Sequence, residues 1–178
     1  MKKVCISFLI ISIIILGLTV FNQPKTQTEY LRIHIRADSN SQQAQSVKYK
    51  VKDAVTGFLT PYVAECKTKE EAEKMISSLL GKIEEVTDRV LLSNGFSYTS
   101  NARLAEEEFP TRKYQDFVLE QGYYDALIIE LGSGQGDNWW CVVYPPLCFT
   151  SGNGNVVYKS KILEIIREWK QTNRVGTR

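Results

Sequence analysis

Beyond residue 29, the first regular pattern of hydrophobic and polar positions is a strict alternation. In the stretch YLRIHIR, which runs from Tyr30 to Arg36, every second residue is a large aliphatic one. The aliphatic positions are Leu31, Ile33 and Ile35, and the positions between them are Arg32, His34 and Arg36. A period of two residues is that of a β-strand, so we expect a strand with one face in the core and its basic residues on the other face.

The pattern then changes to apolar residues spaced three and four apart, which is typical of an amphipathic helix. This helix follows the polar run DSNSQQ, whose short side chains accept hydrogen bonds from the free backbone N–H groups of a first turn. Its apolar positions run from Ala44 to Tyr62. Lys48 and Lys52 lie on the opposite face, which we expect to be solvated, and Pro61 should end or bend the helix.

A second amphipathic helix is predicted to begin at Thr68. Thr68 and Glu71 have the spacing of a capping box, in which each side chain binds a free backbone N–H group of the first turn. The apolar stripe runs from Ala72 to Val90, and Gly95 then offers a residue that accepts the left-handed conformation of a helix end. Both apolar stripes are expected to face the core.

Shorter segments with the composition of strands follow. Residues 96–110 form a polar strand candidate, in which the glutamates at 106–108 are expected on a solvated edge. The stretches YDALIIELG (124–132) and WWCVVY (139–144) are β-branched or aromatic on both faces, so we expect them to be central strands. The glycine-rich residues between them predict a hairpin. A last helix carries Ile162, Leu163, Ile165, Ile166 and Trp169 on one side.

The order of these elements, β-α-α-β-β-β-α, predicts an α+β fold. We expect an antiparallel or mixed sheet of about four strands with helices packed on it. The predicted organisation is a linker at 23–29, a single domain at 30–171 and a polar tail at 172–178.

The first 22 residues predict export from the cytoplasm. Lys2 and Lys3 precede an uncharged, apolar run that ends at Phe21. A charged start followed by an apolar run is the pattern of a secretory signal peptide, and the run is also near the lower length limit for a transmembrane helix. We therefore expect residues 1–22 to be a signal peptide or an N-terminal membrane anchor, with the domain outside the cytoplasm and membrane contact through this segment.

Composition and motif spacing argue against several classes of function. The net charge of +2, with basic and acidic residues interspersed, gives no basic patch for nucleic acid. A single histidine and the lack of a Cys-x-x-Cys motif give no spacing of metal ligands. The glycines at 132–136 precede a strand and not a helix N-terminus, so they do not predict phosphate binding. We expect no metal, no cofactor and no small-molecule substrate.

Two cysteines near the C-terminal end allow more than one interpretation. Pro145 and Pro146 turn the chain between Cys141 and Cys148, which form either a disulfide, the favoured reading for an exported domain, or two buried thiols. Alternatively, one of these thiols and His34 form the nucleophile and base of a cell-envelope enzyme. Cysteines within an aromatic strand and a lone histidine are more often structural, which favours a protein without catalytic residues.

The remaining candidates suit the binding of a protein partner. Tryptophan dominates binding hot spots because it offers a large rigid surface at a low cost in entropy. Adjacent tryptophans on a strand point to opposite faces, so one of the pair at 139–140 is exposed or needs a second packed layer. The candidate partner-binding residues are Arg32, His34, Arg36, Trp139, Trp140, Pro145, Pro146 and Phe149.

Two stretches of the sequence are specific enough to suggest a family. YLRIHIRADSNSQQAQSVKYKVKDAV, followed by GYYDALIIELGSGQGDNWWCVVYPPLCF, resembles the stage II sporulation protein R family of endospore-forming Firmicutes. The resemblance covers nearly everything after the N-terminal segment. The chain departs from the family pattern at RADSN, where many members read closer to Ile-Ala-Asn-Ser-Asp, and at Asp137, but its aromatic and cysteine pattern is kept.

The resemblance implies a secreted developmental signal. Members of this family are made in the forespore and exported into the space between the two septal membranes. There they activate a membrane-embedded aspartic-type protease of the mother cell, which removes the pro-sequence of sigma-E. The resemblance therefore implies that this chain is an activating ligand whose partner is a membrane-embedded sporulation protease.

Overall fold

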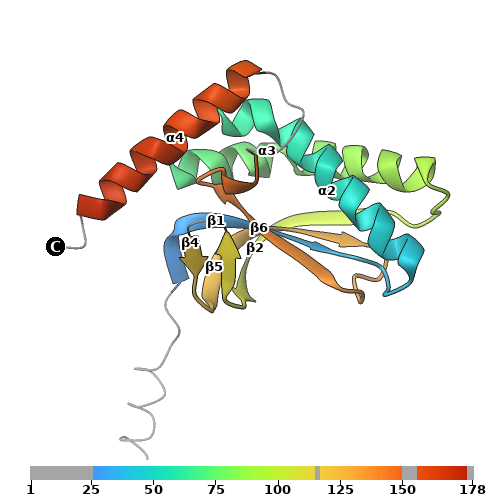
Figure 1. Ribbon diagram of the computed structural model, residues 1–178. Helices are drawn as coiled ribbons and strands as arrows, with labels where there is room; N and C mark the ends of the chain where they lie inside the picture. Colours follow the sequence, from blue (N-terminus) through green and yellow to red (C-terminus); the bar gives the residue numbers. More distant parts are fainter. Residues whose placement is uncertain (1–25, 115–116, 150–155, 176–178) are drawn as a thin grey trace, which may run out of the picture.

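The computed structural model describes residues 26–114, 117–149 and 156–175, and it has the predicted α+β architecture (Figure 1). The strands are β1 (Thr26–Arg36), β2 (Ser100–Phe109), β3 (Arg112–Tyr114), β4 (Phe117–Leu119), β5 (Gly122–Leu131) and β6 (Asn138–Tyr144). The helices are α2 (Gln42–Val63), α3 (Lys69–Ser93), the short 3₁₀ helix η1 (Leu147–Phe149) and α4 (Val156–Val175). The predicted order is confirmed, with β3 and β4 as an added hairpin.

The main sheet is mixed and has the strand order β2-β5-β1-β6. β1 pairs in parallel with β5, while β1 with β6 and β2 with β5 are antiparallel pairs. Because β1 lies between β5 and β6, the glycine-rich turn that joins those two strands is not a hairpin, and that prediction was wrong. The expectation that WWCVVY is a central strand was also wrong, since β6 lies at the edge of the sheet.

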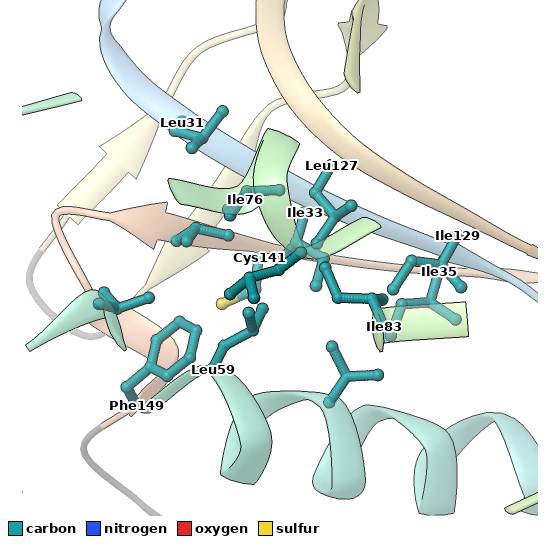
Figure 2. Packing of buried hydrophobic residues seen from close by; sticks show 14 of the residues in the cluster. Leu31, Ile33, Ile35, Leu59, Ile76, Ile83, Leu127, Ile129, Cys141 and Phe149 are labelled. Atoms are coloured by element: carbon teal, nitrogen blue, oxygen red, sulfur yellow. The ribbon is translucent and has the colours of Figure 1, made fainter. Parts of the chain in front are cut away.

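The helices cover one face of the sheet and enclose the larger core (Figure 1). The aliphatic face of β1 packs there as predicted, and Ile33 and Ile35 belong to the same buried cluster as Ile83 of α3 and Leu59 of α2 (Figure 2). Burying one aliphatic side chain of this size stabilises a fold by about 1.5–3 kcal/mol. The spacing of apolar residues in β1, α2 and α3 therefore explains why these three elements pack around one core.

The opposite face of β1 is also buried, contrary to the expectation of a half-buried strand. Arg32 is 0% exposed and His34 is 4% exposed. A second, smaller cluster of apolar residues covers this face, including Phe109 of β2, Leu119 of β4 and Tyr124 of β5. We refer to this side of the sheet as the second face.

The glycine-rich turn packs against the loop that follows β1. Asp38 Oδ1 accepts a hydrogen bond of 2.8 Å from the Ser133 backbone N–H, and Asn40 Oδ1 accepts one of 2.6 Å from that of Asp137. Lys48, expected on a solvated face, is instead 1% exposed, and its Nζ donates to the Asp137 carbonyl at 2.9 Å. The glycines therefore permit close approach of two loops.

The helix ends follow the predicted chemistry. Ser41 and Thr68 are the N-cap residues of α2 and α3, and each side chain accepts a hydrogen bond from a first-turn backbone N–H group. Gly95, just after α3, has φ of 83°, which is the left-handed conformation expected there. Pro61 lies inside α2, close to its C-terminal end at Val63.

The ends of the described chain differ in detail from the predicted organisation. β1 begins at Thr26, within the range expected to be a linker, and α4 continues to Val175, beyond the expected end of the domain at residue 171. The predicted signal peptide or anchor at 1–22 lies outside the described residues. None of the helices in the described ranges combines the length and hydrophobicity of a membrane span.

The loop packing predicts opposite effects for two glycine-to-alanine substitutions. A Cβ at Gly136 would lie 2.4 Å from the Ser39 carbonyl oxygen, a backbone atom, so Gly136→Ala should destabilise the domain by about 1–3 kcal/mol. Gly81 is an exposed position inside α3 with nothing within 4 Å of that Cβ, so Gly81→Ala should stabilise the domain by about 0.5–1 kcal/mol. Thermal unfolding of the two variants checks this, and shifts of the same sign would contradict it.

Candidate functional site

The candidate site lies on the second face of the sheet, where four strands bring distant residues together. β1 contributes His34 and β6 contributes Trp140, and these two residues are register partners. Their rings stack, with centroids 5.4 Å apart and an interplanar angle of 28°. His34 and Trp140 therefore share one face of the sheet, as predicted for His34 and one of the two adjacent tryptophans.

His34 is held by hydrogen bonds on both ring nitrogens. Nδ1 lies 2.7 Å from Glu107 Oε2 on β2, and Nε2 lies 2.8 Å from the side-chain amide of Asn138 on β6. Burial lowers the pKa of His34 to about 4, and the hydrogen bond to Asn138 Oδ1, which raises the pKa, only partly opposes this effect. The nearby Arg36 lowers the pKa further.

The imidazole is therefore neutral at neutral pH. Nδ1 faces the Glu107 carboxylate and Nε2 faces Asn138 Oδ1, so the one N–H of the neutral ring donates to one of these two acceptor oxygens. Arg36 also binds Glu107, which neutralises the carboxylate without a charged histidine. The arrangement fixes the ring under Trp140 but leaves neither nitrogen free to act as a base.

A charged network continues from this histidine across the face. Arg36 binds Glu107 of β2, and its Nη1 lies 2.8 Å from Glu130 Oε1 of β5. Arg103 Nη1 lies 3.1 Å from the second oxygen of Glu130. These side chains are between 18% and 41% exposed, so the network forms a fixed pattern of charge at the surface.

Trp140 forms the aromatic part of this surface and is itself half-buried. One contact is the His34 ring, and another is the guanidinium of Arg112 on β3, whose Cζ lies 4.3 Å from the Trp140 ring centroid. A cation over an indole face contributes about 0.5–1 kcal/mol at exposed sites. Trp140 is therefore fixed in position and has charged groups around it.

Arg32 lies deeper on the same face, inside a cage of aromatic rings. Its Cζ is 4.2 Å from the Phe109 ring centroid, 4.8 Å from that of Tyr124 and 5.5 Å from that of Tyr114. Its Nη2 donates to the Tyr114 hydroxyl, and burial lowers its pKa. Because Arg32 is fully buried, its effect on a partner would be indirect, through the β3–β4 hairpin that Tyr114 holds in place.

The other partner-binding candidates lie elsewhere. Trp139 is half-buried on the helix face of the sheet, opposite to Trp140. Pro145, Pro146 and Phe149 are buried around η1. The structure therefore brings together only His34, Arg36 and Trp140 of the predicted set at one surface.

The cysteines do not form a Cys/His pair with His34. Cys141 and Cys148 are joined in a disulfide, with their Cα atoms 6.3 Å apart. Cys141 also lies in the core under the helices (Figure 2), while the His34 side chain contacts Glu107 and Asn138 on the second face, so the sheet separates them. Cys66 is a free cysteine in the core, and burial raises the pKa of its thiol to about 11.

Five residues of the site were not predicted from the sequence: Arg103, Glu107, Arg112, Glu130 and Asn138. Glu107 was expected on a solvated edge, but its carboxylate turns inward to His34 and Arg36, which lie more than 70 positions away in the chain. The sequence offered one signal for Asn138: it lies two residues before Trp140 on β6, and residues two apart on a strand share a face.

Comparison with known proteins places these features in a family. The family model described as Stage II sporulation protein R (spore_II_R) matches residues 27–153, which include the whole candidate site. The protein named Stage II sporulation protein R from Bacillus subtilis (strain 168) is 35% identical over 156 residues, covering 86% of this chain and 69% of that relative. No solved structure matches the chain.

The environment of His34 predicts how stability depends on pH. The unfolded chain binds a proton at His34 below pH about 6.5, whereas the folded chain binds it only near pH 4. Stability should therefore fall as the pH is lowered from about 6.5 towards 4. Denaturant unfolding between pH 7 and pH 5 checks this, and His34→Gln should flatten the dependence over that range.

The single histidine makes the titration itself directly observable. Proton NMR of the folded protein should show no imidazole titration above pH 5. A midpoint at pH 6.5 or above would mean that His34 is charged by its contact with Glu107, contrary to this account.

Proposed function

The chain belongs to the stage II sporulation protein R family and has a role in sporulation, and from this premise we propose that it is an activating ligand of a membrane-embedded aspartic-type protease. In the proposed pathway the protein is made in the forespore and exported into the space between the septal membranes. The protease that it activates there removes the pro-sequence of the sigma-E precursor. The role of the domain is then recognition of a protein.

The observation that carries this proposal is the held tryptophan on the second face. Trp140 is half-buried, stacked on His34 and flanked by Arg112, and the fixed charges of Arg36 and Glu130 lie on the same face. A rigid aromatic group with a polar rim is the usual centre of a protein interface. It offers a partner a large apolar contact whose geometry is set before binding.

Activation by such a ligand follows from differential affinity. A protease that exchanges between inactive and active forms is shifted towards the active form only when the ligand binds that form more tightly. A pre-set surface suits this role, since little ordering of the ligand side chains opposes binding. The alternative of a cell-envelope enzyme with a Cys/His pair loses its support because His34 and Cys141 lie on opposite faces of the sheet.

The first prediction from this function concerns Trp140. Trp140→Ala should reduce processing of the sigma-E precursor by the protease on the order of 30-fold, because truncating a central hot-spot residue costs about 2 kcal/mol. His34→Ala should give a smaller loss by releasing the tryptophan. The double variant should lose less than the sum of the two, since the rings are in contact.

A control separates binding from folding. Tyr49 is a 51% exposed aromatic residue on α2, on the helix side of the molecule, and Tyr49→Ala should leave processing unchanged. Folded Trp140→Ala protein that supports normal processing would remove this face from the proposal.

The second prediction concerns export. Residues 1–29 fused to a reporter that is active only outside the cytoplasm should give activity, because Lys2 and Lys3 precede an apolar run of the length of an export signal. Replacing two central isoleucines of the run with lysine should abolish the activity. A silent fusion that is expressed at normal levels would contradict the proposed location.

A further inference from the structure

The two edges of the main sheet differ in how their backbone groups are covered. At the β2 edge, the hydrogen bond from Gly132 N–H to the Thr99 carbonyl fixes which residues face β5, so the N–H groups of even-numbered β2 residues point outward. α3 covers two of these groups. Asp88 accepts a hydrogen bond of 2.6 Å from Ser100 N–H, and Glu84 accepts one of 2.8 Å from Ala102 N–H.

The same reasoning applies to β6 at the other edge. Ala37 N–H donates to the Asp137 carbonyl, so in this register the odd-numbered residues of β6 bond to β1. Trp139 N–H therefore points inward to β1. The backbone groups of Asn138 and Trp140 point outward, away from the sheet.

The outer side of β6 is closed only at its C-terminal end. There the Val142 N–H lies 3.4 Å from the Sγ of Cys148, which the disulfide and the η1 turn hold in place. For the outward N–H and C=O groups of Asn138 and Trp140 we find no protein partner within the described ranges. The open stretch therefore begins at Asn138 and ends before Val142.

The side chains also differ between the two edges: those at the β2 edge protect it from pairing, whereas those at the open part of β6 do not. Natural sheets block an open edge with charged side chains, proline or covering elements. The β2 edge has the α3 carboxylates together with the exposed Glu106 and Glu108. Residues 138–141 of β6 carry no charge and no proline, and half-buried tryptophans flank the edge on both faces.

We propose that the outer edge of β6 receives an extended segment of a protein partner, which pairs with Asn138 to Trp140 as an additional strand of the sheet. Unpaired backbone groups in a row define the occupant chemically, because another strand is what satisfies both donors and acceptors at this spacing. The partner's side chains on either side of that strand would contact Trp139 on one face and Trp140 on the other. Arg112, over the Trp140 ring, favours a carboxylate in the segment on the second face.

This inference rests on the proposed function only for the identity of the partner, the protease; the edge itself is defined by the fold. It also gives both tryptophans of β6 a role, although they lie on opposite faces. A strand added at β6 would contact Trp139 and Trp140 at once, whereas a ligand bound only to the second face would contact Trp140 alone.

Amide exchange at the tryptophans tests the inference in the unmodified protein. The sequence has three tryptophans, so ¹⁵N-tryptophan labelling gives three backbone amide signals. In the free protein, Trp140 N–H should exchange with solvent at least about 100-fold faster than Trp139 N–H, which is bonded to β1. Adding the protease in detergent micelles should slow the exchange of Trp140 and leave that of Trp169 on α4 unchanged.

Two outcomes of this measurement would overturn the inference. Slow exchange of Trp140 in the dilute free protein would mean that its amide already has a partner. Slowing of Trp140 exchange with rising concentration of this protein alone would mean that the edge pairs with a second copy of the chain.

Proline substitutions test the same edge in sporulating cells, without assuming which partner binds. Trp140→Pro removes an outward N–H that β1 does not use, so the domain should stay folded, and comparison with Trp140→Ala separates the backbone group from the side chain. Glu106→Pro and Glu106→Ala form the matched pair on the β2 edge. We expect Trp140→Pro to lower the yield of heat-resistant spores about 100-fold relative to Trp140→Ala, with no such difference at residue 106.

The outcomes separate this inference from the proposed function. If folded Trp140→Pro and Trp140→Ala proteins give equal spore yields, strand addition is wrong, even when wild type activates the protease. If the proline effect is present but wild type does not bind the protease, the edge is confirmed and the proposed partner is wrong. Should Trp140→Pro not fold, the exchange rates of Trp140 and Trp139 in the wild type decide the matter.

Discussion

β1 lies in the middle of a mixed sheet, with β5 on one side and β6 on the other, and it is buried on both faces. Its aliphatic face closes the core under the helices, while its other face carries Arg32, His34 and Arg36 into or beside a second cluster. Burying such groups costs free energy unless each one finds a partner. The partners come from β2, β3, β5 and β6, so the whole second face is organised around this requirement.

The contacts of these three side chains explain the site, although Nε and Nη1 of Arg32 have no hydrogen-bond partner among the described residues. The Arg32 guanidinium meets aromatic faces, His34 remains neutral between Glu107 and Asn138, and Arg36 pairs with two carboxylates. The same contacts fix Trp140, because its ring rests on the imidazole. A surface tryptophan that is fixed in this way presents one shape to a partner. The buried contacts of the second face therefore support the proposed recognition.

Local chemistry was readable from the sequence, whereas long-range pairing was not. The helix caps at Ser41 and Thr68, the turn at Gly95 and the aliphatic face of β1 depend on residues close in sequence, and all were predicted. The position of β6 at the edge depends on β1 passing between two strands that are adjacent in sequence, for which no local pattern exists. The burial of Lys48 and the inward orientation of Glu107 likewise depend on groups about 70 to 90 positions away, so both looked solvated.

In the proposed function, this domain acts by binding and shifts a protease towards its active form. The most direct test is reconstitution of the family's sporulation protease in liposomes with the sigma-E precursor, to which the purified domain is added at increasing concentration. Processing should be slow without the domain, rise with its concentration and saturate, with no consumption of the domain. Processing at the same rate with and without a folded, intact domain would contradict the proposed function.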